Sequence, residues 1–333
     1  MDDEQRTPQT SERADEAVLE RLEQVVRSSK LSSSFGAATT PRFKLIREIK
    51  PEAHSPLVRP LVLAVTPQNN LLVVDLPQPD RFRVRELSPE GACRTVIAEL
   101  HKGPDDNQVL EPFSVAVDGE HNFYVLDAAA GALKKFSYDG RWLDSFFAAG
   151  PDGTPFANPR DFALDGSGGL YVADTNNDRI VKLRPNGELE WILDQFAAAD
   201  GSDEPDSLYE PMSVAVAPTG RIFVADTNQN RVLCFDGAGK FQRSIAGEGT
   251  VEFPSRVRCG GPDESVHVMD QSGVRITRFD PQGRSTGCLR VAGLGLETIG
   301  PEGSAGFGVD RAGHVALINA LRESISILDF LEA

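Results

Sequence analysis

Aspartate residues recur along the chain at one position of a repeated pattern. Each ends a short apolar run, and together they are Asp75, Asp127, Asp174, Asp226 and Asp270. In three copies an arginine follows five residues later, namely Arg179, Arg231 and Arg275. Aspartate at the start of a turn accepts hydrogen bonds from the backbone of that turn, and an arginine across a tight turn can pair with it. The pattern predicts a structural ion pair at the base of each turn.

One of these turns has the oxygen-rich composition of a calcium loop. Residues 174–178 read DTNND. An EF-hand loop also needs glycine at its sixth position and glutamate at its twelfth, and both are missing here. We therefore interpret the segment as a turn rich in Asp and Asn.

The repeated aspartates lie within a longer pattern of short apolar runs. Four such runs, at 213–216, 222–225, 232–235 and 241–246, lie between Gly, Pro, Asn and Asp residues. Short runs of β-branched and aromatic residues with these boundaries predict antiparallel strands. Each copy thus predicts a meander of four strands, named here a to d.

The internal spacing of the copies is nearly constant. From the apolar residue that opens strand a to the residue that closes strand b, the separation is 12 in five copies and 13 in one: Leu63 to Asp75, Val115 to Asp127, Phe162 to Asp174, Val214 to Asp226, Phe307 to Asn319, and Val257 to Asp270. A four-stranded repeat of this kind is typical of a propeller blade. Six copies predict six blades.

The third and fourth copies also resemble a known family. The string VAVAPTGRIFVADTNQNRVLCFD at 214–236 and the string VADTNNDRI at 172–180 are similar to the NHL repeat. The resemblance covers about residues 43–330 and implies an all-β, six-bladed NHL-type β-propeller. We divide the chain into a polar segment over 1–40 and a propeller over 41–333.

One predicted strand has no blade of its own. Residues 43–49, FKLIREI, precede the first copy, whereas the last copy supplies only strands a, b and c (306–310, 315–319 and 324–329). An unfilled position would leave a sheet edge unpaired. We expect the N-terminal strand to take the outermost place in the last blade.

Residues 11–30 predict a short amphipathic helix, followed by a flexible linker. Its apolar face consists of Ala14, Val18, Leu22, Val25 and Val26. Two interpretations remain open: a solvated or weakly docked helix, and a tether through which the chain forms oligomers. The first residues lack the features of a secretory signal and no apolar run is long enough to span a membrane, so we expect a cytoplasmic protein.

The longest connecting segments, 100–112, 148–159 and 195–211, are expected on one face of the propeller, called here the long-loop face. Binding residues are concentrated on loops held by a rigid scaffold, and aromatic residues and arginine are common interface anchors. The candidate anchors amid these acidic loops are Phe156, Arg160, Tyr209 and Met212. A protein or peptide is the expected partner.

The starts of the six a strands are expected to line the mouth of the central channel. Their aligned residues are Val62, Ser114, Asp161, Ser213, Arg256 and Gly306, with Phe113 just outside. Asp161, Arg256 and the serines are able to orient a small polar ligand. The alternative is a water-filled channel with solvated side chains.

The resemblance leaves an enzymatic alternative, a metal-dependent hydrolase or lyase of the gluconolactonase-like or amidating-lyase-like type. Such sites need several converging histidines or carboxylates. Only His54 and His101 of the five histidines approach the long-loop face, and the innermost ring supplies only Asp161. Four scattered cysteines contain no CxxC pair, which predicts free thiols. We favour a non-enzymatic scaffold and expect no catalytic residue, metal or cofactor.

The charge of the chain opposes nucleic-acid binding. The net charge is −16, and residues 1–40 contribute −3 (8 acidic minus 5 basic), which leaves −13 on the propeller. Affinity for nucleic acid comes largely from lysine and arginine on phosphates. We therefore expect no nucleic-acid partner.

Overall fold

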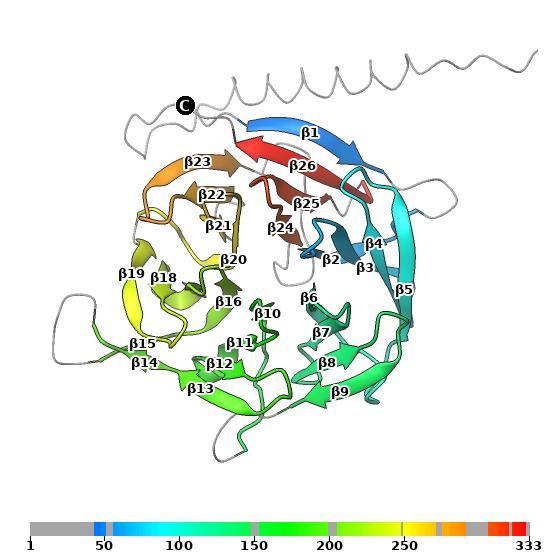
Figure 1. Ribbon diagram of the computed structural model, residues 1–333, viewed down its shortest axis with the longest axis horizontal. Helices are drawn as coiled ribbons and strands as arrows, with labels where there is room; N and C mark the ends of the chain where they lie inside the picture. Colours follow the sequence, from blue (N-terminus) through cyan, green and yellow to red (C-terminus); the bar gives the residue numbers. More distant parts are fainter. Residues whose placement is uncertain are drawn as a thin grey trace, which may run out of the picture.

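The computed structural model describes residues 43–50, 56–147, 153–198, 205–247, 249–270, 275–290, 306–319 and 322–330. Over these residues the chain forms six four-stranded antiparallel sheets arranged around a central axis, as Figure 1 shows. The predicted all-β, six-bladed propeller is confirmed. The predicted helix over 11–30 and the linker after it lie outside the described residues.

Each of the first five blades is a meander whose first strand lies nearest the axis (Figure 1). The first blade consists of β2 (Pro60–Val65), β3 (Leu71–Gln78), β4 (Arg81–Leu87) and β5 (Cys93–His101). The second consists of β6 (Pro112–Val117), β7 (Phe123–Asp127), β8 (Ala132–Phe136) and β9 (Trp142–Phe146). The third consists of β10 (Asp161–Leu164), β11 (Leu170–Asp174), β12 (Arg179–Leu183) and β13 (Leu189–Leu193).

The fourth blade consists of β16 (Pro211–Val216), β17 (Ile222–Asp226), β18 (Arg231–Phe235) and β19 (Phe241–Ala246). The fifth consists of β20 (Pro254–Gly260), β21 (Ser265–Asp270), β22 (Arg275–Phe279) and β23 (Ser285–Arg290). Between the third and fourth blades lies a small ribbon of β14 (Gln195–Phe196) and β15 (Asp206–Ser207). Two 3-10 turns, η1 (Thr175–Asn177) and η2 (Thr227–Gln229), follow β11 and β17.

The sixth blade joins the two ends of the described chain. Its strands β24 (Phe307–Val309), β25 (Val315–Asn319) and β26 (Ser324–Phe330) are completed by β1 (Phe43–Ile49). β1 runs antiparallel to β26, from Phe43 opposite Phe330 to Ile49 opposite Ile325. The sheet order β1-β26-β25-β24 confirms that the N-terminal strand takes the outermost place in the last blade.

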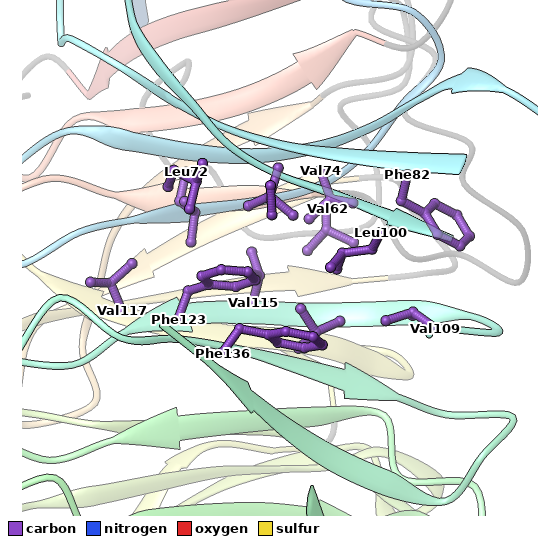
Figure 2. Packing of buried hydrophobic residues seen from close by; sticks show 14 residues of the cluster. Val62, Leu72, Val74, Phe82, Leu100, Val109, Val115, Val117, Phe123 and Phe136 are labelled. Carbon is purple, nitrogen blue, oxygen red and sulfur yellow. The ribbon is translucent and has the colours of Figure 1, made fainter. Parts of the chain in front are cut away.

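Apolar side chains fill the interfaces between blades. One cluster lies at each of the six interfaces, and the cluster between the sixth and first blades contains Ile49 of β1. Figure 2 shows the cluster between the first and second blades, where Val62 and Val74 face Val115. Burial of such side chains contributes about 1.5–3 kcal/mol each. The scaffold beneath the loops is therefore a closed ring of packed sheets.

Two further predictions, on the cysteines and on membrane-spanning segments, can be compared with the structure. All four cysteines are free thiols. Among the described residues, no helix is long and apolar enough to cross a membrane.

Candidate functional site

The repeated aspartates hold the connections of the long-loop face in place. Asp174 accepts hydrogen bonds from the backbone N–H of Ala157 (2.7 Å) and from Nε of Arg179 (2.7 Å). Asp226 and Asp270 bind Tyr209 and Glu252 of their own preceding connections in the same way, with Arg231 and Arg275 as partners. The predicted Asp–Arg pairs are confirmed. The backbone groups in these bonds belong to the connection before strand a, whereas the sequence suggested the turn after strand b.

The first two blades use other cations for the same purpose. Asp75 pairs with Arg83 (2.6 Å) and Arg85 (2.9 Å), and Asp127 lies 3.5 Å from Nζ of Lys134. These cations lie on strand c, further along the chain than the five-residue spacing. The five-residue spacing therefore missed these cations, although a buried carboxylate needs a cation in each of the five copies that contain the aspartate.

Turns of one blade also fix the entry into the next blade. The hydroxyl of Thr175 donates to the carbonyl of Pro211 (2.9 Å), and that of Thr227 donates to the carbonyl of Pro254 (2.7 Å). Asn230 Oδ1 accepts from the backbone N–H of Phe253 (2.8 Å). Because these bonds cross blade boundaries, neighbouring connections keep a fixed relation to each other.

Three large apolar side chains are exposed on consecutive connections of the long-loop face. Phe147, Tyr209 and Phe253 are 44%, 51% and 46% exposed and precede blades three, four and five. Tyr209 and Phe253 flank the turn that contains η2, because the backbone N–H of Asn228 donates to the carbonyl of Tyr209 and Asn230 binds Phe253. We call Phe147, Tyr209 and Phe253 the aromatic arc. Sequence reasoning identified only Tyr209.

The other candidate anchors lie deeper than Tyr209. Phe156 is 5% exposed and packs in the cluster between blades two and three, and Phe113 is also buried. Arg160 lies over the Phe113 ring, with its guanidinium carbon 4.6 Å from the centroid. Met212 is half-buried on β16. Of this set, Tyr209 is the most accessible to a partner; residues 148–152 and 199–204 of the same loops lie outside the described part.

The channel is crossed by a polar cluster centred on Asp161. The buried Asp161 carboxylate accepts hydrogen bonds from the hydroxyls of Ser114 (2.7 Å) and Ser213 and from Nη1 of Arg258 (2.7 Å). A second guanidinium, that of Arg256, approaches to 3.4 Å. One carboxylate thus joins the innermost strands of blades two, three, four and five. The alignment anticipated four of these residues and missed Arg258.

Arg256 extends this cluster toward the channel mouth. Its Nη1 donates to the carbonyl of Arg160 (2.7 Å) and its Nη2 to the carbonyl of Phe113 (3.1 Å). Burial, with smaller contributions from Arg258 and Arg160, lowers the pKa of Arg256 to about 10 against the opposing effect of Asp161. Burial raises the pKa of Asp161, but the two guanidinium groups and Ser213 outweigh it, so that this pKa lies below its ordinary value.

Metal-ligating side chains do not gather in the described part of the chain. No three His, Cys, Asp or Glu residues lie together there in a way that could hold a metal ion. His267 is buried within β21, His101 ends β5, and His121 and His314 lie next to β7 and β25. His54 lies outside the described residues.

The comparison with known families finds the NHL repeat at two places. Residues 156–183 and 208–235 match it, and these ranges cover the first three strands of blades three and four. No match was found among curated proteins.

Solved structures share the overall architecture. A gluconolactonase from Xanthomonas campestris is 16% identical, with a TM-score of 0.58 over 91% of this chain and 93% of that chain. Virginiamycin B lyase from Staphylococcus aureus is 10% identical, with a TM-score of 0.54 over 87% and 100% of the two chains. A chain of a nidogen/laminin complex is 19% identical, with a TM-score of 0.53 over 69% and 80%. At these identities the likeness shows the fold alone. Together with the matched repeats, it establishes that the chain is a six-bladed β-propeller with NHL repeats in its third and fourth blades.

Proposed function

We propose that the chain is a non-enzymatic scaffold that binds a protein or peptide partner through the long-loop face of blades three to five. The observation that carries this proposal is the aromatic arc. Phe147, Tyr209 and Phe253 expose large apolar side chains on three consecutive connections. Aromatic side chains of this kind supply much of the binding energy of protein interfaces.

Hydrogen bonds at the arc favour binding by lowering its entropic cost. The backbone of Tyr209 donates to Asp226 (2.8 Å), and that of Phe253 donates to Asn230 (2.8 Å). A loop that is already held in its bound conformation loses less conformational freedom when a partner binds. The arc thus presents anchors on a pre-organised backbone.

The charge around the arc indicates the chemistry of the partner. Glu210 and Glu252 lie next to Tyr209 and Phe253 in the chain, and Asp178 and Asp194 lie on the same side of blade three. The propeller as a whole is acidic. A partner segment with lysine or arginine beside apolar side chains is complementary to such a surface.

The solved relatives allow both a binding role and an enzymatic one. A propeller chain of this fold occurs in a nidogen/laminin complex, which supports the use of the fold in protein binding. The metal-dependent hydrolase or lyase alternative rests on fold likeness to a gluconolactonase and a lyase, and fold does not determine function. The scaffold proposal has a surface feature of this chain in its favour.

Affinity capture followed by mass spectrometry tests the proposal. The full chain is compared with a Tyr209→Ser, Phe253→Ser double variant, and Arg160→Glu with Tyr209→Ala tests the neighbouring Arg160. The matched control is Trp142→Ser with Leu143→Ser, two exposed apolar residues on the outer strand of blade two. We expect the arc variants to lose the captured partner and the control to retain it. Equal capture by all variants would show that the face is wrong.

A further inference from the structure

The outer strands of the sixth and first blades present apolar and positively charged side chains together on the rim of the ring. β1 and β5 are the outermost strands of neighbouring blades, as Figure 1 shows. On β1, Lys44, Ile46 and Arg47 are exposed, and on β5, Arg94 and Val96 are exposed. The exposed fractions of the two apolar residues are 40% for Ile46 and 44% for Val96. We call these five residues the outer rim patch.

The turn between β4 and β5 connects the two halves of the patch. Nη1 of Arg47, on β1, donates to the carbonyl of Pro89 in this turn (3.0 Å). A hydrogen bond with Ser88 lowers the pKa of Glu90 in the same turn. Arg47 and Arg94 lower it further, so both guanidinium groups lie near this one carboxylate. The patch therefore continues from the sixth blade to the first.

The patch differs in charge from the other exposed apolar pair on the rim. Trp142 and Leu143 lie on β9, and the exposed Asp144 follows them. Arg141, which precedes them, forms an ion pair with Asp139 (Nε to Oδ2, 3.3 Å). The outer rim patch combines its apolar side chains with three cations, and such a surface is complementary to a segment that is both apolar and acidic.

The position of β1 in its sheet also favours contact with another segment. The sheet order β1-β26-β25-β24 places β1 at the edge. An edge strand presents backbone N–H and C=O groups that no neighbouring strand of its sheet binds, and exposed apolar side chains beside such an edge promote association. A segment that covers the patch would therefore protect this edge.

The N-terminal part of the same chain has the complementary composition. Residues 11–26 contain five acidic and two basic residues. The apolar face predicted for this segment consists of Ala14, Val18, Leu22, Val25 and Val26. Residues 27–42, 16 in number, connect the segment to Phe43 at the start of β1. A connection of that length spans up to about 55 Å, whereas β1 itself is about 20 Å long, so the segment can reach every part of the patch.

We propose that residues 11–26 bind the outer rim patch of their own chain, with apolar side chains on Ile46 and Val96 and carboxylates beside the three cations. Attachment within one chain gives the segment an effective concentration on the order of millimolar, so weak contacts suffice. The proposal selects the docked helix from the two interpretations that the sequence left open. The patch lies on blades six and one and does not involve the aromatic arc, so either proposal can fail without the other.

Hydrogen–deuterium exchange of the full chain, measured for residues 11–26, tests this contact. The patch variants are Ile46→Ser with Val96→Ser, and Lys44→Glu with Arg94→Glu. The matched controls are Trp142→Ser with Leu143→Ser on β9, and Lys240→Glu with Arg243→Glu at exposed positions of blade four. An isolated helix of this length is marginal in water, so loss of the contact should speed exchange of residues 11–26 by roughly tenfold. We expect this change in both patch variants and in neither control.

A variant in the segment tests the contact without a change in the propeller. Val18→Ser with Leu22→Ser should speed exchange of β1 and of residues 93–97, because the patch is then uncovered. An increase in sodium chloride from about 0.05 M to about 0.5 M should have the same effect on the parent, because exposed charges are screened.

Three results overturn the proposal. The first is equal exchange of residues 11–26 in the parent and in both patch variants. The second is faster exchange in the controls as well, because the contact is then not specific to the patch. The third is protection that increases with protein concentration, because the segment then binds a second copy of the chain.

Discussion

At the scale of single residues, one buried carboxylate connects the innermost strands of four blades. Asp161 receives hydrogen bonds from β6, β16 and β20, which belong to three other blades. Removing one member of a buried charged network leaves its partners unpaired, which is more costly than the loss of one contact. The cluster therefore fixes the spacing of the innermost strands.

Substitution of Asp161 measures this contribution. We expect Asp161→Asn to lower the free energy of unfolding by about 3–5 kcal/mol, because Arg256 and Arg258 then share no counterion. Denaturant unfolding at neutral pH provides the measurement. Asp144→Asn, at an exposed position of β9, is the control and should change stability by less than about 0.5 kcal/mol. A similar small effect of Asp161→Asn would contradict the structural role of the cluster.

His267 makes stability dependent on pH. Its ring is buried, no described residue forms a hydrogen bond with either ring nitrogen, and burial together with Arg278 lowers its pKa from 6.5 to about 3. The unfolded chain therefore binds a proton between these values that the folded chain does not bind. Stability must fall as the pH drops below about 6.5, by about 1.4 kcal/mol for each pH unit.

Replacement of His267 by leucine should remove this loss. At pH 5 we expect His267→Leu to be more stable than the parent by about 2 kcal/mol, with a smaller difference at pH 8. Denaturant unfolding at a series of pH values measures both chains, and His101→Leu, at an exposed position, is the control. Parallel stability curves for His267→Leu and the parent would rule out His267 as the source.

Residue types predicted the ion pairs but not every exposed or buried side chain. Asp174 and Arg179 were found because both lie within one turn, where sequence distance determines spatial distance. Arg258 was missed because its partner Asp161 lies 97 residues away. Phe156 was expected to be an exposed anchor and is buried, whereas Phe253 was not expected to be one and is exposed. The sequence could not distinguish them, because the path of a connection over the core decides which side chain is covered.

At the scale of elements, the turns between strands c and d hold neighbouring blades together. In five blades a glycine with positive φ packs against the outermost strand of the preceding blade. These residues are Gly91, Gly140, Gly187, Gly239 and Gly283. Gly91 packs against Ile49 of β1, so the same contact between neighbouring blades is present where the first blade meets the sixth. The regular spacing of the apolar runs allowed the strands to be predicted from the sequence, because strand pairing imposes it in every blade. The small ribbon of β14 and β15 carries no such repeat and was not predicted.

Two alanine substitutions separate the contact between blades from the cost of backbone conformation. A Cβ atom on Gly283 would lie 2.8 Å from the carbonyl oxygen of Ile245, whereas Gly220 has a similar positive φ and open space around it. We expect Gly283→Ala to destabilise the chain by about 1–3 kcal/mol more than Gly220→Ala. Thermal unfolding of the two variants measures the difference. Equal decreases in Tm would mean that the turn at Gly283 does not pack tightly against the preceding blade.

At the scale of the whole molecule, the ring depends on a strand from the beginning of the sequence. β1 covers β26, and its Ile49 packs in the cluster that joins the sixth blade to the first. The incomplete last copy made this arrangement predictable, because a three-stranded final blade leaves an edge that FKLIREI can fill. The repeat pattern does not determine the partner, the cytoplasmic location or the oligomeric state, and these stay predictions.

Two truncations test the closure. Removal of residues 1–40 leaves β1 intact and should leave the Tm within about 2 °C of the full chain. Removal of residues 1–50 exposes the edge of β26 and the apolar side chains beneath it, and should lower the Tm by about 5–15 °C. Scanning calorimetry compares the two. Equal Tm values would show that β1 is not needed to close the ring.

The most direct test of the binding proposal is the footprint of a captured partner, measured by hydrogen–deuterium exchange of the full chain with and without it. A partner that binds the aromatic arc should slow exchange around residues 205–212 and 249–254 and leave the outer strands β1, β5 and β9 unchanged. Protection confined to those outer strands, or to the turns between strands a and b on the opposite face, would contradict the account.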